Sequence, residues 1–297
     1  MLSQNSIATI LVSGANGQLA NELKTLSHNY PSFQFLFTTK EVLPIENGEV
    51  LKSFFEQNKI DYCINCAAYT AVDKAEAEQE KAFLINATAV GELAHICKEH
   101  HAKLIHISTD YVYDGSSTIP LTEQSSLAPI NIYGLSKLKG EELAIRENAF
   151  TLIIRTSWVY SSFGNNFVKT MLRLFKEKDE INVINDQLGS PTYAADLAGV
   201  IMKFIAKKEE GNDFSGIVNY SNSGITTWYE FAEEIKLLVN SNCKINPIPT
   251  SSYKTPAKRP SYSVLDTSKI KELLHLEIPD WRESLKKCIG ILSENFN

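Results

Sequence analysis

Short apolar runs rich in β-branched residues recur along the first half of this chain and alternate with longer amphipathic stretches. Such runs are typical of strands buried in a parallel sheet, and the stretches between them have helical periodicity. The predicted strands are residues 7–12, 33–37, 62–68, 104–108 and 151–155. The predicted helices are residues 18–26, 50–57, 75–100 (as one helix or two) and 133–148. This alternation predicts a doubly wound parallel sheet, a Rossmann-like α/β fold.

The pattern becomes less regular after residue 160. Helices are predicted at residues 167–176, 194–206 and 228–239, and Pro247, Pro249, Pro256 and Pro260 mark a loop-rich stretch. We therefore expect residues 1–160 to form the Rossmann-like domain. Residues 161–297 are expected to form mainly a smaller substrate-binding portion, partly interleaved with the first domain.

A turn of small residues joins the first predicted strand to the first predicted helix. Gly14, Gly17 and Ala20 have the spacing Gly-x-x-Gly-x-x-Ala. Gly14 allows a sharp turn, Gly17 lets the backbone approach a pyrophosphate, and Ala20 lets the helix pack closely on the strand. Free N–H groups at the start of the helix would then face the anion. An ordinary strand–turn–helix is the alternative, but the position after the first strand favours a dinucleotide site.

The second predicted strand ends without the acidic residue that usually holds a ribose 2′-hydroxyl. Residues 37–41 read Phe-Thr-Thr-Lys-Glu. Lys40 could instead meet a 2′-phosphate, which favours NADPH over NADH. The alternatives are that Lys40 is a solvated loop residue or that Glu41 turns toward the ribose, so NADH stays possible.

A tyrosine and a lysine open the helix predicted after the fourth strand. Tyr133 and Lys137 are four residues apart and share one helix face. Reduction of a ketone needs a hydride from a nicotinamide and a proton, and a nearby ammonium lowers the tyrosine pKa from its usual value of about 10. Thr109, at the end of the fourth strand, would help to polarise the carbonyl. We therefore predict a nicotinamide-dependent reductase with Tyr133, Lys137 and Thr109 as its catalytic residues.

These motifs together resemble the extended short-chain dehydrogenase/reductase superfamily. Longer segments resemble the dTDP-4-dehydrorhamnose reductase family within it: residues 65–76, 108–113, 155–160, 164–167, 186–192 and 255–260. The resemblance implies reduction of the C4 ketone of dTDP-4-dehydro-β-L-rhamnose to dTDP-L-rhamnose, a precursor of cell-surface polysaccharides such as O-antigen.

The resemblance also implies roles for single residues. Tyr133 is expected to be the proton donor and Lys137 its partner. The expected substrate contacts are Thr109, Asp110, Trp158 and Arg259. The expected cofactor contacts are Gly14, Asn16, Gly17, Gln18, Leu19, Lys40, Ala67, Ala68, Tyr69, Ser108 and Lys137.

Several of these residues also have a purely structural interpretation. Trp158 could be core, Asp110 could cap a turn, and Arg259 could be a surface arginine. Asp73 could cap the helix that follows it. His106 lies inside the fourth strand, and we interpret it as packed rather than catalytic.

Some members of the family hold magnesium with acidic residues at a dimer interface. Glu22 matches one such position, but Ala195 stands at the place of a second acid and Asp196 is one step away. We therefore expect no metal site, with Glu22 a doubtful candidate, and both a monomer and a homodimer stay open.

Composition narrows the possible partners and location. The net charge is −6 and the basic residues are scattered, so nucleic acid is not an expected partner. No segment approaches the roughly 18 consecutive apolar residues of a membrane span, and residues 1–6 lack the basic start of a signal peptide. Cys63 and Cys66 form a CxxC inside a strand-like run, which favours buried, reduced structural cysteines over a redox pair. We expect a cytoplasmic enzyme.

Two other functions fit parts of the pattern. A nucleotide-sugar epimerase or 4,6-dehydratase shares the glycine loop and the tyrosine–lysine pair. A dehydratase commonly has an Asp-Glu pair after the strand-four threonine, whereas Tyr111 follows Asp110 here. A non-catalytic regulatory subunit on this fold typically lacks the tyrosine or the lysine, and both are present. The epimerase stays open on chemistry alone.

Overall fold

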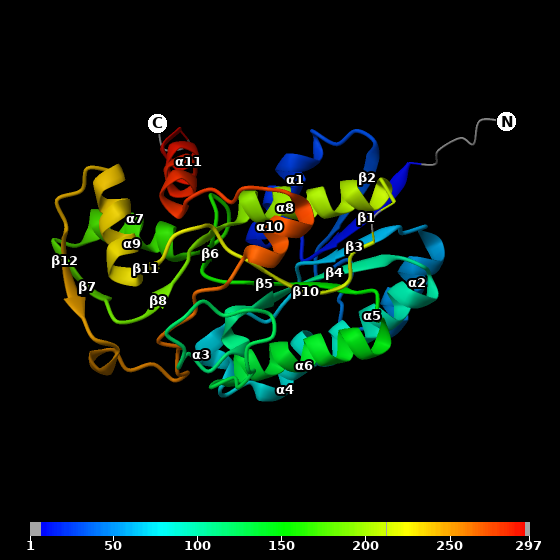
Figure 1. Ribbon diagram of the computed structural model, residues 1–297, viewed down its shortest axis with the longest axis horizontal. Helices are drawn as coiled ribbons and strands as arrows, with labels where there is room; N and C mark the ends of the chain where they lie inside the picture. Colours follow the sequence, from blue (N-terminus) through cyan, green and yellow to red (C-terminus); the bar gives the residue numbers. More distant parts are fainter. Residues whose placement is uncertain (1–6, 212, 295–297) are drawn as a thin grey trace.

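A six-stranded sheet forms the centre of the computed structural model, which describes residues 7–211 and 213–294 (Figure 1). The strands, in sheet order, are β10 (Gly216–Tyr220), β5 (Leu152–Thr156), β4 (Lys103–Thr109), β3 (Tyr62–Asn65), β1 (Ala8–Ser13) and β2 (Phe33–Thr38). Each neighbouring pair is parallel. The predicted doubly wound, Rossmann-like fold is confirmed. The N-terminal residues 1–6, on which part of the targeting prediction rests, lie outside the described residues.

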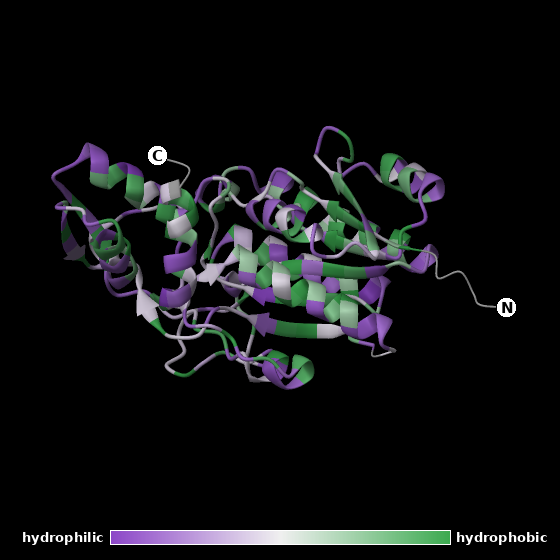
Figure 2. Ribbon diagram, turned by 90° about the horizontal axis from the view of Figure 1, so that it is seen from above, coloured by the Kyte–Doolittle hydropathy of each residue, from purple (hydrophilic) through white to green (hydrophobic). Residues whose placement is uncertain are grey.

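Helices cover both faces of the main sheet. On one face lie α1 (Gln18–Ser27), α8 (Ala194–Glu209) and α10 (Ser268–Leu274). On the other lie α2 (Gly48–Gln57), α5 (Ala89–Glu99) and α6 (Ile132–Glu147). Figure 2 shows apolar residues concentrated in the strands of the sheet, while the helices mix apolar and polar residues.

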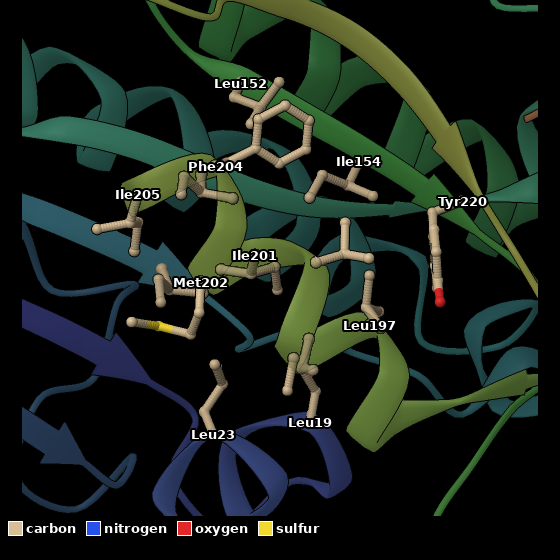
Figure 3. Packing of buried hydrophobic residues seen from close by; sticks show 14 of the residues in the cluster. Leu19, Leu23, Leu152, Ile154, Leu197, Ile201, Met202, Phe204, Ile205 and Tyr220 are labelled. Atoms are coloured by element: carbon tan, nitrogen blue, oxygen red, sulfur yellow. The ribbon is translucent and has the colours of Figure 1, made fainter. Parts of the chain in front are cut away.

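The packing of α1 against α8 illustrates how these layers are held. Leu19 and Leu23 are four residues apart on one face of α1, and both are buried. They face Leu197 and Ile201 of α8 (Figure 3). Full burial of one such side chain contributes about 1.5–3 kcal/mol. This packing holds α1, and with it the preceding glycine turn, against the end of β1.

The helix predicted at residues 75–100 is broken into four pieces. They are α3 (Val72–Ala75), α4 (Gln79–Phe83), a π-helical turn η1 (Leu84–Thr88) and α5. Asn86, in the π-helical turn, accepts from Tyr69 N at 2.8 Å and donates to Tyr69 O and to Ser136 Oγ at 3.0 Å. The turn therefore fixes the segment that follows β3 against α6.

The strand predicted at residues 62–68 ends at Asn65. The Asn65 side chain accepts a hydrogen bond from Ala67 N at 3.1 Å. The chain therefore leaves the sheet at this point, and the residues that follow become available to a site at the carboxyl end of the sheet.

A second hydrophobic core lies beside the main sheet, around Phe231 and Trp281. It is built by α7 (Phe167–Glu177), α9 (Trp228–Leu238), α11 (Trp281–Glu294), β7 (Glu180–Ile184) and β12 (Lys244–Ile248). We call these elements the second lobe. Short segments complete the chain: η2 (Asp110–Val112), β6 (Val159–Tyr160) with β9 (Thr192–Tyr193), β8 (Leu188–Gly189) with β11 (Thr226–Thr227), and η3 (Thr250–Ser252). Within the described ranges, no helix is long and apolar enough to cross a membrane.

The later part of the chain contributes to both cores. Helices α8 and α10 and strand β10 pack with the main sheet, whereas α7, α9 and α11 form the second lobe. Pro247 was predicted in a loop, but it lies in β12. This strand pairs with β7 in a two-stranded sheet, so its other edge is open and a residue without an N–H is tolerated.

Candidate active site

A cleft of about 720 Å³ lies at the carboxyl ends of β1, β3, β4 and β5. Most of the predicted site residues line it: Gly14, Asn16, Gly17, Gln18, Leu19, Lys40, Ala67, Ala68, Ser108, Thr109, Asp110, Tyr133, Lys137 and Trp158. A larger hollow of about 1350 Å³ lies in the second lobe, between α7 and the ends of α9 and α11, and its walls contain none of the predicted residues. The structure therefore gathers the predicted chemistry in the smaller cleft.

The glycine turn has the geometry of a phosphate-binding loop. Gly14 has a φ of +70°, and a Cβ there would lie 2.8 Å from Ala67 N. Gly17 caps α1 without a side-chain hydrogen bond, and Asn21 Nδ2 holds the turn by donating to Gly17 O at 2.8 Å. The loop therefore fits an anion that approaches bare backbone at the start of a helix.

Lys40 lies at the rim of the cleft that the glycine turn also lines. Its Nζ is 2.8 Å from Glu46 Oε1, and both residues line the cleft. Its side chain is 63% exposed, so the ammonium is available to a ligand. The alternative residue, Glu41, is not part of the cleft wall, and the Thr39 hydroxyl lowers the pKa of its carboxyl.

Tyr133 stands in the first turn of α6, next to Thr109. Asn131 caps the helix by accepting from Gly134 N at 2.8 Å and donating to Lys258 O at 2.8 Å, which fixes this turn. Burial raises the pKa of Tyr133 to about 12, although a hydrogen bond with the Thr109 hydroxyl lowers it. The phenol is therefore protonated at neutral pH.

Lys137 is buried one turn further along α6. Its Nζ donates to Ile107 O at 2.6 Å and lies 3.2 Å from His106 Nε2. Burial lowers the pKa of Lys137 to about 8. We predicted that this lysine lowers the pKa of Tyr133. In the structure the contacts of Lys137 go to β4, and burial is the largest influence on the pKa of the phenol.

Asp110 follows Thr109 at the end of β4 and is almost fully buried. Thr109 Oγ1 donates to Asp110 Oδ1 at 3.0 Å. Burial raises the pKa of Asp110 to about 6, against the lowering effect of the Ser263 and Thr109 hydroxyls. Its other oxygen, Oδ2, has no hydrogen-bond partner of normal geometry among the described residues. A buried carboxylate oxygen in this position suits a hydroxyl of a substrate.

Ser108 lines the cleft, but its hydroxyl is already engaged. The Ser108 hydroxyl donates to Glu141 Oε1 at 2.5 Å. The other oxygen of this carboxylate, Oε2, accepts a hydrogen bond from Arg155 Nη2 at 2.6 Å. Because the hydroxyl of Ser108 is used in this way, the cofactor contact predicted for Ser108 would be made by its other atoms.

Trp158 lies on the side of the cleft that faces the second lobe. Its backbone has a φ of +47°, which is costly for a bulky residue. Its ring stacks on Trp228 of α9, with centroids 3.6 Å apart and planes 10° from parallel. Trp158 lines the cleft and is not simple core. Sequence reasoning assigned no site role to Trp228.

Tyr69 and Arg259 were predicted in the site, but neither belongs to the described cleft wall. The Tyr69 ring packs with Ala75 and Ala82. Arg259 is paired with Asp73 through contacts of 2.8 and 3.1 Å. Asp73 thus binds an arginine instead of capping a helix.

The acidic residues at the possible magnesium position are hydrogen-bonded to donors of this chain. Glu22 is buried, its pKa is raised by burial, and it accepts from Ser161 Oγ at 2.6 Å. Asp196 Oδ2 accepts from Ser284 and Asn222. No cluster of three His, Cys, Asp or Glu side chains occurs within residues 7–211 and 213–294.

The five cysteines are free, and four are buried. Cys66 differs from the prediction because it is partly exposed and lines the cleft beside Ala67.

Comparison with known proteins gives a consistent result. A family model described as the RmlD substrate binding domain matches residues 8–293. A dTDP-4-dehydrorhamnose reductase of Escherichia coli K12 is 41% identical over 295 residues, covering 95% of this chain and 97% of that protein. The crystal structure of a dTDP-4-dehydrorhamnose reductase from Clostridium acetobutylicum has a TM-score of 0.91 and 40% identity, covering 96% of this chain and 99% of that chain. Another, from Bacillus anthracis and in complex with NADP, has a TM-score of 0.90 and 36% identity over the same shares.

Proposed function

The chain belongs to the dTDP-4-dehydrorhamnose reductase family, and we propose that it reduces the C4 ketone of dTDP-4-dehydro-β-L-rhamnose with Tyr133 as the proton donor. The family resemblance found in the sequence is confirmed. The chain is an NADPH-dependent oxidoreductase, and bound NADPH supplies the hydride to the ketone carbon. The observation that carries the proposal is the placement of Tyr133, Thr109 and the buried carboxyl group of Asp110 in the cleft that also contains the glycine turn.

The cofactor would be held by the turn and the walls of the cleft. The loop from Gly14 to Leu19 offers backbone N–H groups to a pyrophosphate, and the missing Cβ of Gly14 leaves room for close approach. Lys40 would bind the 2′-phosphate of NADPH at the rim. Ala67 and Ala68 would form one wall.

Tyr133 acts as an acid in this direction of reaction. A phenol with a pKa of about 12 holds its proton at neutral pH and can donate a hydrogen bond to the ketone oxygen. The alkoxide that forms on the substrate is a far stronger base than a phenolate. Proton transfer from Tyr133 to this oxygen is therefore favourable, and Thr109 holds the phenol in position.

The sugar nucleotide would lie between the main sheet and the second lobe. Asp110 would accept a hydrogen bond from a sugar hydroxyl, and Trp158 would pack against the ring. Arg259 stays a proposed diphosphate contact only if it exchanges its ion pair with Asp73. We also propose a cytoplasmic location and a role in supplying rhamnose to surface polysaccharide, with monomer and homodimer both open.

The test follows NADPH absorbance after dTDP-4-dehydro-β-L-rhamnose is added to the protein. We expect one NADPH oxidised for each dTDP-L-rhamnose formed. Substrate that is epimerised or dehydrated without NADPH oxidation would instead indicate an epimerase or a dehydratase. A substrate that stays unchanged would indicate a non-catalytic regulatory subunit.

A further inference from the structure

Two tryptophans meet where the cleft borders the second lobe, and the mechanism above uses only one of them. Trp158 lines the cleft, whereas Trp228, the first residue of α9, does not belong to the described cleft wall. Their rings lie face to face, with centroids 3.6 Å apart and planes 10° from parallel. Trp228 therefore covers one face of the Trp158 indole, and a ligand in the cleft can meet only the rest of this ring.

The backbone of Trp158 is strained, so the surrounding contacts have to hold this residue in place. Its φ of +47° lies in the left-handed region, which is costly for a bulky residue. The chain is anchored on either side of the ring. Trp158 O accepts from Thr192 N at 3.2 Å, and the Ser157 hydroxyl donates to Ser190 O at 2.8 Å. Backbone strain of this kind persists only where the structure around it fixes the residue, which here includes the contacts of the indole.

Trp228 is itself fixed from two directions. Thr227 begins α9 with a capping box: its hydroxyl accepts from Glu230 N at 3.1 Å, and the Glu230 carboxylate accepts from Thr227 N at 3.0 Å. Phe167 and Phe231 of the second lobe also pack against the ring, with centroids 4.7 and 6.4 Å from it. The ring of Trp228 therefore forms a fixed surface of the second-lobe core.

Gly189 leaves the space that the Trp158 indole occupies. A Cβ on Gly189 would lie 2.6 Å from Cε2 and Cζ2 of the indole and 2.9 Å from the Ser263 hydroxyl. Gly189 does not have the left-handed backbone that favours glycine, so these side chains are what an alanine would meet. Gly189 lies in β8, which pairs with β11, the strand that leads directly into Trp228. One small ladder thus places both Trp228 and a residue without a side chain around the indole.

From this geometry we propose that Trp228 and Gly189 are positioning residues, which hold Trp158 as a fixed wall for the sugar of the substrate. The inference rests on the proposed function and deepens it, because Trp158 is the proposed contact of the sugar ring. An indole that is already in place loses little conformational freedom when the sugar binds. Loss of either positioning residue should therefore weaken binding of the sugar nucleotide, while NADPH, bound at the glycine turn, keeps its affinity.

The first test reads the orientation of Trp158 without any ligand. The chain has three tryptophans, so protein labelled with 5-fluorotryptophan gives a simple ¹⁹F spectrum, and single Trp→Phe substitutions assign it. We expect one sharp Trp158 signal in wild type and in Trp228→Phe, which keeps a flat ring for stacking. In Trp228→Leu the signal should split or broaden, because the indole takes more than one orientation. A signal that is equally sharp in all three proteins, or split in wild type, would overturn the proposal.

The second test measures binding by calorimetry, with dTDP-L-rhamnose, the proposed product, added to protein saturated with NADP⁺. We expect its Kd to rise about tenfold in Trp228→Leu and in Gly189→Ala, and less than about threefold in Trp228→Phe. The Kd for NADPH should stay within about twofold of wild type in each variant. An unchanged Kd for dTDP-L-rhamnose in Trp228→Leu, or a parallel loss of NADPH affinity, would reduce Trp228 to general packing.

A double variant shows whether Trp228 acts through Trp158. Trp158→Ala should raise the Kd for dTDP-L-rhamnose by itself, because the wall is gone. Adding Trp228→Leu to this variant should then change the Kd little further, since residues that share one role have effects that do not add. Fully additive effects would contradict the proposed link between the two tryptophans.

Two variants in the second lobe are matched controls. Trp281→Phe removes a buried indole that packs edge-on against Phe231, outside the stacked pair. Gly290→Ala adds a methyl that meets no atom within 4 Å. Both should leave the Trp158 signal and the Kd for dTDP-L-rhamnose unchanged, and a Trp281→Phe variant as weak as Trp228→Leu would contradict the proposal. The ¹⁹F signal needs neither ligand nor turnover, so a failed reductase assay counts against the proposed function alone.

Discussion

Arg155 and Glu141 form an ion pair that is sealed from solvent behind the cleft. Their side chains are 0% and 2% exposed, and Arg155 Nη2 donates to Glu141 Oε2 at 2.6 Å. Arg155 also donates to the Tyr113 hydroxyl at 2.9 Å, and Ser108 donates to the carboxylate. The pair therefore ties α6, which carries Tyr133 and Lys137, to β4 and β5.

Breaking this pair should destabilise the whole fold. Glu141→Gln leaves a buried guanidinium without its counter-charge, and we expect the free energy of unfolding to fall by about 3–5 kcal/mol. Urea denaturation followed by circular dichroism measures this. The control is Glu177→Gln, which removes an exposed partner of Arg173 on α7 and should cost less than about 0.5 kcal/mol. Similar losses in the two variants would contradict the account.

Asp110 should make stability depend on pH. Its folded pKa, about 6, is above the usual 3.8 because the ionised form is buried. The resulting stability is fully present below pH 3.8 and is lost as the pH rises through 6. Asp110→Asn should therefore stabilise the protein at pH 7.5 by up to about 3 kcal/mol, two pKa units at about 1.4 kcal/mol each, with the gain vanishing near pH 4. The variant should also lose turnover.

The control for this prediction is Asp114→Asn. Asp114 is exposed, and hydrogen bonds from Ser116 lower its pKa, so its replacement should not stabilise the protein at pH 7.5. Urea unfolding at pH 4.5 and 7.5 measures the free energy of unfolding of both variants relative to wild type. A gain for Asp110→Asn that is the same at both pH values would refute a buried, ionised Asp110.

Two glycines should respond oppositely to alanine. Gly14→Ala places a methyl 2.8 Å from Ala67 N at a φ of +70°, so we expect lower stability and at least about a tenfold loss of NADPH affinity. Gly199→Ala in α8 meets no atom within 4 Å and should add up to about 1 kcal/mol through helix propensity. Thermal unfolding and NADPH fluorescence titration measure both effects. Unchanged NADPH binding in Gly14→Ala would contradict the phosphate-loop assignment.

Lys40 should select NADPH over NADH. Lys40→Ala removes an exposed ammonium at the rim of the cleft, and we expect KM for NADPH to rise about tenfold with little change for NADH. Lys59→Ala is the control, because Lys59 is also exposed and is paired with Asp61, away from the cleft. An equal rise in KM for NADPH and for NADH would show that Lys40 does not bind the 2′-phosphate.

The sequence predicted the main sheet well, except where strands are short or polar. Strands β1, β3 and β5 are short, largely apolar and β-branched runs, and almost all of their residues are buried. Strand β10 was not predicted because it is short, begins at Gly216 and has a polar residue, Asn219, among its apolar ones. Asn219 is fully buried, and its side-chain amide is satisfied by donating to Leu121 O at 2.8 Å. This contact joins segments about a hundred residues apart in the sequence. Helices α10 and α11 and strands β7 and β12 were also not predicted.

The site was predictable where a local motif carries it. The glycine spacing after the first strand and the Tyr133–Lys137 pair indicate chemistry in combination, and both line the cleft. The partners of these residues could not be predicted, because they come from other elements. His106 reads as an ordinary strand residue, and only the folded chain brings it to Lys137. Likewise, Arg259 has a side chain suited to a diphosphate, and only the structure pairs it with Asp73.

The role of Tyr133 as proton donor is tested most directly by Tyr133→Phe in the NADPH oxidation assay with dTDP-4-dehydro-β-L-rhamnose. Tyr229→Phe, on α9 away from the cleft, is the control for loss of a phenol hydroxyl. We predict that kcat falls by about 10²- to 10⁴-fold in Tyr133→Phe alone, while its Kd for NADPH stays within about twofold of wild type. A Tyr133→Phe variant that turns over at near the wild-type rate would contradict the account.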